Sequence, residues 1–175
     1  MEIGVGGYDQ AEVGGGSLRV WRDCFPFSRI VGLDLHEKNV DLGSRVTVVQ
    51  GDQANETDLT RVIEVLGGPP NIVIDDGSHL VDHAIVSFSI LFPQMPSDSI
   101  YIVEDLQTSY SENWGGGIPA PDATAVGFAK GLVDAVQVQD PTFDRRPQDG
   151  PRPTHWADGV GAIHVYPGIV FIQKV

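Results

Sequence analysis

Cysteine, basic residues and long apolar runs are all scarce in this sequence of 175 residues. Cys24 is the only cysteine, so an internal disulfide is excluded and a reducing, cytoplasmic compartment is expected. Lys and Arg number 11 against 24 Asp and Glu, a formal net charge of −13 that repels nucleic acid and attracts cations. No apolar run approaches the roughly 20 residues that span a bilayer, so neither nucleic acid nor a membrane is an expected partner.

Strand-like and helix-like patterns alternate along the chain. Hydrophobic residues make up 41% of it, enough for the core of one domain over residues 1–175. We expect strands at 3–5, 29–35, 45–52, 71–74 and 99–105, helices at 17–25, 56–66, 82–92 and about 122–137, and a terminal hairpin that turns at 166–168. Such alternation predicts an α/β domain with a mostly parallel sheet covered by helices on both faces.

Three residues predict where the first two helices begin or end. Asn55 and Gly67 suit the N-cap and the C-terminal end of the helix at 56–66. Ser17 suits the N-cap of the helix at 17–25.

A glycine turn follows the first strand in "EIGVGGY", residues 2–8. Glycines at this position let backbone N–H groups approach a ligand. An acid that can accept from ribose hydroxyls, Asp34, ends the second strand, and "QGDQ", residues 50–53, ends the third. The spacing does not match the dinucleotide fingerprint, because Asp34 lies 28 residues after Gly6 and Tyr8 replaces the third glycine.

Paired acids end two apolar strands, in "NIVIDDGSH" and "SIYIVEDLQTSY". If these strands are neighbours, Asp76, Glu104 and Asp105 converge at the carboxyl edge of the sheet, where ligands bind. Three carboxylates stay ionised together only with a cation, and oxygen ligands suit Mg²⁺, with Mn²⁺ or Ca²⁺ as alternatives. The competing interpretation is separate solvated acids at strand ends.

His79 follows Asp76 by three residues and could act as a general base near neutral pH. A helix-start histidine bonded to local backbone is the structural alternative. His79 and His83 also have the four-residue spacing of a zinc pair, but "HLVDH" lacks the glutamate of zinc proteases, so magnesium is favoured.

Taken together, "EIGVGGY", "GLDL", "GDQ", "IDDGSH" and "VEDLQTSY" with a following Trp114 resemble the metal-dependent S-adenosylmethionine O-methyltransferases of macrolide sugars, of the mycinamicin and demethylmacrocin type. The resemblance extends from residue 2 to the terminal "VFIQK". It implies a class I, Rossmann-like methyltransferase fold: a seven-stranded, mostly parallel sheet with an antiparallel last strand.

The resemblance also implies roles for individual residues. His79 would be the base, Tyr110 and Trp114 with the 140–158 segment would form a lid, and a sugar hydroxyl would be methylated. The implied metal ligands are Asp76, Glu104 and Asp105. The implied S-adenosylmethionine pocket consists of Glu2, Gly4, Gly6, Ser17, Asp34, Asp52, Gln53 and Asp75.

Other functions stay open at this point. Family members often carry a long segment before the glycine turn, whereas Met1 directly precedes it here, so the chain could lack an auxiliary segment and its first strand should be very short. The alternatives are a NAD-dependent Rossmann oxidoreductase, a non-catalytic remnant that binds an S-adenosyl ligand or metal, and a metal-assisted hydrolase. Family analogy favours a homo-oligomer, and the sequence identifies neither a partner face nor the glycoside acceptor.

Overall fold

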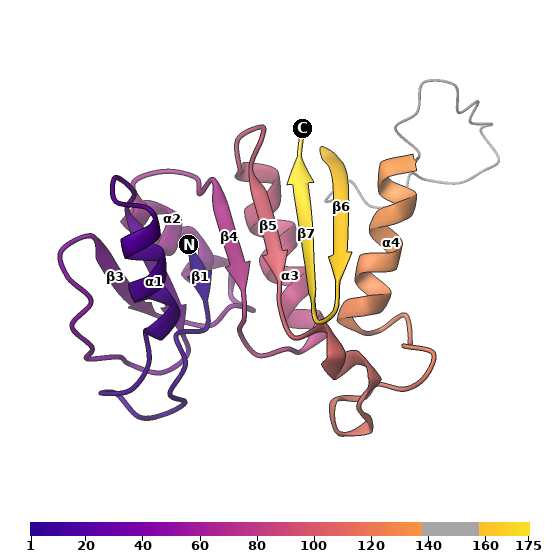
Figure 1. The fold of residues 1–175 in the computed structure, drawn as a ribbon, viewed down its shortest axis with the longest axis horizontal. Helices are drawn as coiled ribbons and strands as arrows, with labels where there is room; N and C mark the ends of the chain where they lie inside the picture. Colours follow the sequence, from indigo (N-terminus) through magenta and orange to yellow (C-terminus); the bar gives the residue numbers. More distant parts are fainter. Residues whose placement is uncertain (138–157) are drawn as a thin grey trace.

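A seven-stranded sheet forms the centre of the computed structural model, which describes residues 1–137 and 158–175 (Figure 1). The strand order is β3-β2-β1-β4-β5-β7-β6, and β7 is antiparallel to both of its neighbours, as the class I fold predicts. The strands are β1 Glu2–Ile3, β2 Ile30–Asp34, β3 Val46–Gln50, β4 Ile72–Asp75, β5 Ile100–Val103, β6 Val160–Tyr166 and β7 Ile169–Lys174.

Helices cover both faces of this sheet, unequally. The core shared by α2, α3 and α4 lies on one face, and α1 packs on the other (Figure 1). The α-helices are α1 Gly16–Cys24, α2 Glu56–Leu66, α3 Val81–Leu91 and α4 Ala125–Gln137. Short 3₁₀ helices follow α3 and β5: η1 Phe92–Gln94, η2 Leu106–Tyr110 and η3 Glu112–Trp114.

The sheet reverses its strand order between β1 and β4. β1 pairs in parallel with β2 on one side and with β4 on the other, although it contains only two residues. β4 then pairs in parallel with β5, the neighbour relation on which the predicted carboxylate cluster depends. In open α/β sheets the crevice at such a reversal is where ligands bind.

Local signals fixed most of the helix and turn boundaries. The Asn55 side chain accepts hydrogen bonds from two backbone N–H groups of α2, and Gly67 ends that helix in the left-handed region at φ 89°. The predicted hairpin is present, with Gly168 at φ 80° between β6 and β7. The prediction for Ser17 was wrong: Gly15 is the N-cap of α1, and the Ser17 hydroxyl instead donates to Glu2.

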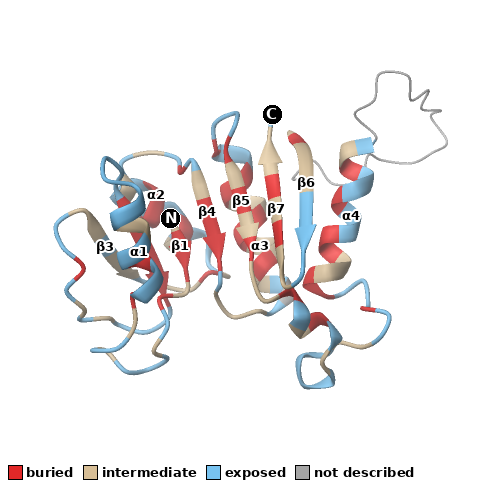
Figure 2. Cartoon of the chain, in the orientation of Figure 1, coloured by how far each residue is buried: buried red, intermediate tan, exposed pale blue. Residues whose placement is uncertain are grey.

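The larger core lies between the sheet and the α2–α3–α4 layer (Figure 2). At its centre the ring of Phe88 stacks on Phe92 at 4.5 Å and meets Tyr101 and Phe128 edge-on at 5.0 and 5.2 Å. Phe88, Phe92 and Tyr101 are fully buried. This cluster fixes β5 against α3 beneath the carboxyl edge of the sheet.

On the other face, no helix of the described part of the chain lies over β4, β5 and β7 (Figure 1). The strand registers place an apolar stripe there, and most of its side chains are half-buried. The stripe consists of Ile72, Ile74, Ile100, Ile102 and Phe171.

None of the helices formed by residues 1–137 has both the length and the apolar character needed to cross a membrane.

Glu2 is a carboxylate buried within the sheet. It is 2% exposed and accepts hydrogen bonds from the Ser17 hydroxyl and the Trp21 indole N–H. Burial raises its pKa above the ordinary value of 4.5, although the two donors partly offset this. Glu2 also lines a cavity of about 380 Å³ at the amino ends of the strands, together with Trp21, Phe25 and Ile72.

The raised pKa of Glu2 predicts how the free energy of unfolding depends on pH. The folded chain keeps the Glu2 proton to a higher pH than the unfolded chain, so this contribution to stability falls as the pH rises from 4.5 through the raised pKa. We expect Glu2→Gln to remove that decline in urea unfolding followed from about pH 4 to about pH 8. The exposed Glu12→Gln is the control. An identical pH dependence in wild type and Glu2→Gln would contradict the prediction.

Candidate active site

The carboxyl ends of the parallel strands bring the polar motifs to one edge of the sheet. β1 leads into the glycine turn, β2 ends at Asp34, and β4 and β5 lead into Asp76 and Glu104. The chain passes directly from each buried strand into these loops. Sequence reasoning placed these residues at this edge, and the strand order now makes the β4 and β5 ends adjacent.

The glycine turn lies against the loop that follows β4. Gly4 has φ 87°, and a Cβ atom there would lie 2.1 Å from the carbonyl oxygen of Asp76. Gly6 has a similar φ of 76°, but a Cβ atom on it would have no described atom within 4 Å. Gly4 is therefore required by close backbone approach, whereas Gly6 borders open space that a ligand can occupy.

The acids at the ends of β2 and β3 organise their own loops. One carboxylate oxygen of Asp34 accepts from the backbone N–H of Val5 at 2.9 Å, and the other accepts from His36 at 2.9 Å. Asp52 accepts from the N–H of Ala54 at 2.8 Å. Asp34 therefore joins the end of β2 to the glycine turn, beside the open space next to Gly6.

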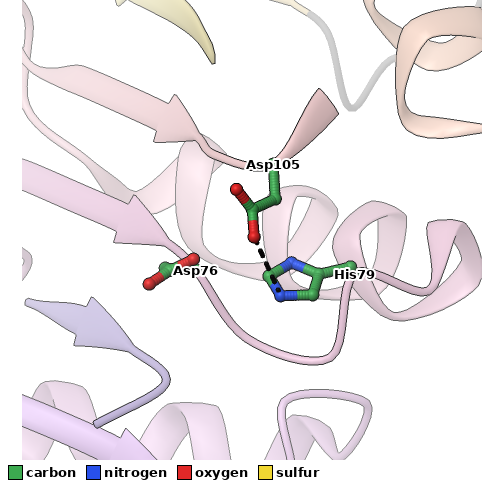
Figure 3. Close-up of side chains that lie close together, drawn as sticks. All are labelled: Asp76, His79 and Asp105. Carbon is green, nitrogen blue, oxygen red and sulfur yellow. Dashed lines mark ion pairs between the residues drawn. The ribbon is translucent and has the colours of Figure 1, made fainter. Parts of the chain in front are cut away.

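Asp76, His79 and Asp105 form a compact group of potential metal ligands (Figure 3). One ligand atom from each lies within 4.8 Å of the others, and His79 Nε2 is 3.4 Å from Asp105 Oδ2. Figure 3 shows these side chains converging from the loop after β4 and the end of β5. Of the predicted ligands, Asp76 and Asp105 are in this group, Glu104 is not, and His79 joins it instead.

Glu104 nevertheless belongs to the same electrostatic cluster. Burial raises its pKa first, and the charges of Asp76 and Asp105 raise it further. The pKa of Asp76 is also raised, first by burial and then by Asp105 and Asp75, while His79 opposes the shift. Carboxylates that repel one another in this way are stabilised by a cation, so the donor set fits a hard divalent metal ion.

His79 has an unusual backbone conformation. Its φ of 57° lies in the left-handed region, which is rare for residues other than glycine. The ring meets Trp114 edge-on at 5.9 Å between centroids. His83, the second member of the zinc-type pair, lies 3.0 Å from the Ser78 hydroxyl through Nδ1 and is absent from the ligand group found among the described residues. The structure therefore does not bring the two histidines together as metal ligands.

Gln53 and Asp75 are buried behind the ligand group. Gln53 is 6% exposed and Asp75 is 3% exposed. The amide nitrogen of Gln53 donates to Asp75 Oδ1 at 3.1 Å, and Asp75 also accepts from Ser87 and Tyr101. Burial raises the pKa of Asp75, and its hydrogen-bond donors offset part of this effect.

Sequence reasoning missed several neighbours of the site. Ser87 and Tyr101 lie inside an apolar helix and an apolar strand, and only the register reveals that both point at Asp75. The predicted lid residues Tyr110 and Trp114 are about half exposed, on η2 and η3. The predicted lid segment 140–158 lies, except for residue 158, outside the described residues.

The chain is similar over 99% of its length to several O-methyltransferases. No protein-family model matches the chain. It is 41% identical over 177 residues to demethylmacrocin O-methyltransferase of Streptomyces fradiae and 39% identical over 177 residues to mycinamicin VI 2''-O-methyltransferase of Micromonospora griseorubida. It is also 39% identical over 175 residues to 8-demethyl-8-alpha-L-rhamnosyl tetracenomycin-C 2'-O-methyltransferase of Streptomyces olivaceus. Each match covers 99% of this chain but only 43% to 45% of the relative.

A solved methyltransferase structure also matches the chain. The MycE methyltransferase of the mycinamycin biosynthetic pathway, in complex with Mg and SAH, matches 99% of this chain with a TM-score of 0.87 and 38% identity, over 44% of its own length. The fold is therefore that of a class I methyltransferase. Within that class, the resemblance to sugar O-methyltransferases predicted from the motifs is confirmed across 99% of the chain, which spans less than half the length of these relatives.

The two turn glycines form a matched pair for a stability test. Gly6→Ala should cost roughly 1–2 kcal/mol, because an L-residue is strained at its φ. Gly4→Ala has the same strain and a clash with the carbonyl oxygen of Asp76, so we expect a loss of about 3 kcal/mol or more. Chemical denaturation of both variants measures the difference. Equal losses would show that the Asp76 loop moves aside freely.

Proposed function

We propose that the chain transfers a methyl group from S-adenosylmethionine to a sugar hydroxyl of a glycosylated natural product, with a divalent metal ion, Mg²⁺, at its site. The observation that carries the proposal is the convergence of Asp76, His79 and Asp105 beside the glycine turn of a class I methyltransferase sheet. It is supported by relatives that are named as O-methyltransferases of glycosylated compounds, and by a MycE complex with Mg, SAH and mycinamycin VI.

We assign cofactor binding to the β1, β2 and β3 ends. The open space at Gly6 leaves room for the cofactor beside the backbone, and Asp34 ends β2 while Asp52 follows β3, whose carboxyl ends lie at the same edge. Gly4, Glu2 and Ser17 also belong to the predicted pocket, but Glu2 and Ser17 bond to each other. The contacts of Glu2 with Ser17 and of Gly4 with the Asp76 loop support a role in shaping the turn.

We assign metal binding to Asp76, Asp105 and Glu104. The mutual repulsion that raises the pKa values of Asp76 and Glu104 supports this, since a bound cation would relieve it. When bound, Mg²⁺ would supply Lewis acidity that lowers the pKa of a sugar hydroxyl, and Mn²⁺ or Ca²⁺ would suit the same oxygen donors.

We assign the role of general base to His79. His79 lies in the ligand group with Nε2 3.4 Å from Asp105 Oδ2, so the imidazole could take the hydroxyl proton there and the Asp105 carboxylate would stabilise the resulting imidazolium. The sugar oxygen then forms a bond to the methyl carbon while the carbon–sulfur bond breaks, and sulfur leaves with the electron pair as a neutral thioether. Trp114 meets the His79 ring edge-on, and with Tyr110 it would flank the acceptor and limit water access.

A second candidate is a binding module without turnover of its own. The chain spans only 43% to 45% of its relatives, so residues that contact their acceptors could come from the remainder of those proteins. This candidate predicts cofactor and metal binding without methyl transfer to any glycoside.

The first test is a calorimetric titration with S-adenosylhomocysteine and with MgCl₂. We expect wild type to bind both and Asp76→Ala to lose the Mg²⁺ signal while it keeps cofactor affinity within about threefold, because only the metal ligand is removed. Asp82→Ala, an exposed acid in the first turn of α3, is the control and should retain both. Failure of wild type to bind S-adenosylhomocysteine would refute the proposed function.

A second test concerns the base. Where the chain methylates a glycoside, His79→Gln should lower kcat by about 10²- to 10⁴-fold, because proton removal is lost while binding is retained. His164→Gln, on the exposed end of β6, should leave kcat unchanged. A His79→Gln variant with wild-type kcat would show that another group removes the proton.

A further inference from the structure

The loop that carries Asp76 and His79 is held through its own backbone. Its first N–H, that of Asp76, donates to the carbonyl oxygen of Ile3 in β1 at 3.0 Å. The loop is therefore fixed where it leaves β4 by a partner that does not belong to the ligand group.

Gln53 extends this restraint to Ser78. Its side-chain oxygen accepts from the N–H of Ser78 at 2.7 Å, and its side-chain nitrogen donates to Asp75. The amide lies directly over Gly77, where a Cβ atom would be 2.0 Å from the Gln53 oxygen. The absence of a side chain at Gly77 is thus what allows Gln53 to reach the loop.

Asp75 anchors Gln53 to the core. Asp75 Oδ2 accepts from the Ser87 hydroxyl at 2.7 Å and from the Tyr101 hydroxyl at 3.0 Å. Ser87 lies on α3 and Tyr101 on β5, where its ring packs against Phe88. The chain of contacts therefore runs from the aromatic core through two buried polar side chains to the backbone of Ser78.

We propose that Gln53 and Asp75 form a buried clamp that positions the metal-ligand and base loop, residues 76–79, rather than contacting the cofactor. The clamp would hold His79 at its left-handed φ, which is unfavourable for an L-residue, and would keep its ring against Asp105 and Trp114. Both are positioning residues, and they deepen the proposed function by assigning Gln53 and Asp75 to the metal side of the site.

The hydrogen bonds of the clamp argue against direct cofactor binding. Both polar atoms of the Gln53 amide and both carboxylate oxygens of Asp75 have protein partners. The two side chains are at most 6% exposed. Withdrawing either of them to meet a ligand would leave buried donors unpaired, which is unfavourable.

The test compares Gln53→Met with Gln50→Met. Methionine keeps the length of glutamine and removes its hydrogen bonds, and Gln50 is an exposed residue at the end of β3 that bonds only the carbonyl oxygen of Leu35 at 3.3 Å through its side chain. We expect Gln53→Met to weaken Mg²⁺ binding about 10- to 100-fold, with S-adenosylhomocysteine affinity within about threefold of wild type. Gln50→Met should change neither.

A readout without any ligand accompanies the titrations. The ring-proton NMR signals of His79 sense the neighbouring indole of Trp114, so they should shift in Gln53→Met and stay unchanged in Gln50→Met. Unchanged His79 signals in Gln53→Met would overturn the clamp. So would weakened S-adenosylhomocysteine binding with intact Mg²⁺ affinity, which would identify Gln53 as a cofactor ligand.

Two further outcomes separate the clamp from the proposed function. If Gln53→Met does not fold, Tyr101→Phe replaces it, since this variant removes one hydroxyl from Asp75 and keeps the ring in the Phe88 cluster. It should shift the His79 signals in the same direction, and their constancy would overturn the clamp. A wild type that binds Mg²⁺ but no S-adenosylhomocysteine would refute the methyltransferase assignment alone. The Mg²⁺ affinities and His79 signals of wild type, Gln53→Met and Gln50→Met would still test the clamp.

Discussion

The backbone of a two-residue strand connects the two halves of this protein. β1 pairs with β2 on one side and β4 on the other, so Glu2 and Ile3 connect the half of the sheet with the predicted cofactor residues to the half with the predicted metal ligands. The same strand opens into the glycine turn, and Gly4 lies too close to the Asp76 loop for any side chain. The hydrogen bonds of this short strand therefore help to set the relative position of the predicted cofactor and metal residues, and the buried contacts around Glu2 and Asp75 reinforce both sides of this junction.

Acidic side chains are concentrated at the carboxyl edge of the sheet. Asp76, Glu104 and Asp105 follow neighbouring strands, and burial and mutual repulsion raise the pKa values of the first two. Such an arrangement lowers stability in the absence of a cation. Asp34, by contrast, is satisfied by two backbone N–H groups, which suits a residue that shapes a loop.

Much of this could be predicted from the sequence, because strand ends, caps and turns are local. The strands at 71–74 and 99–105, the cap at Asn55 and the hairpin at Gly168 have signals within a few residues. What failed depended on tertiary contacts. Ser17 suits an N-cap in isolation, yet a buried Glu2 fifteen residues earlier takes its hydroxyl. Which of Glu104 and His79 joins the tight ligand group depends on how the loops turn after β4 and β5, and no local pattern encodes that turn.

Asp75 and Asp76 are adjacent in the chain and lie in opposite surroundings. The two-residue period of a strand turns the first toward α3 and the aromatic core, while the second faces the carboxyl edge with the potential metal ligands. A shift of β4 by one residue would put Asp75 in the place of Asp76 and Ile74 beside the buried donors, or Asp76 in the place of Asp75 and Gly77 in the ligand group. Either shift would also turn Val73 to the opposite face of the sheet, so a pairing error at this strand would disrupt the core packing together with one of the two carboxylate positions.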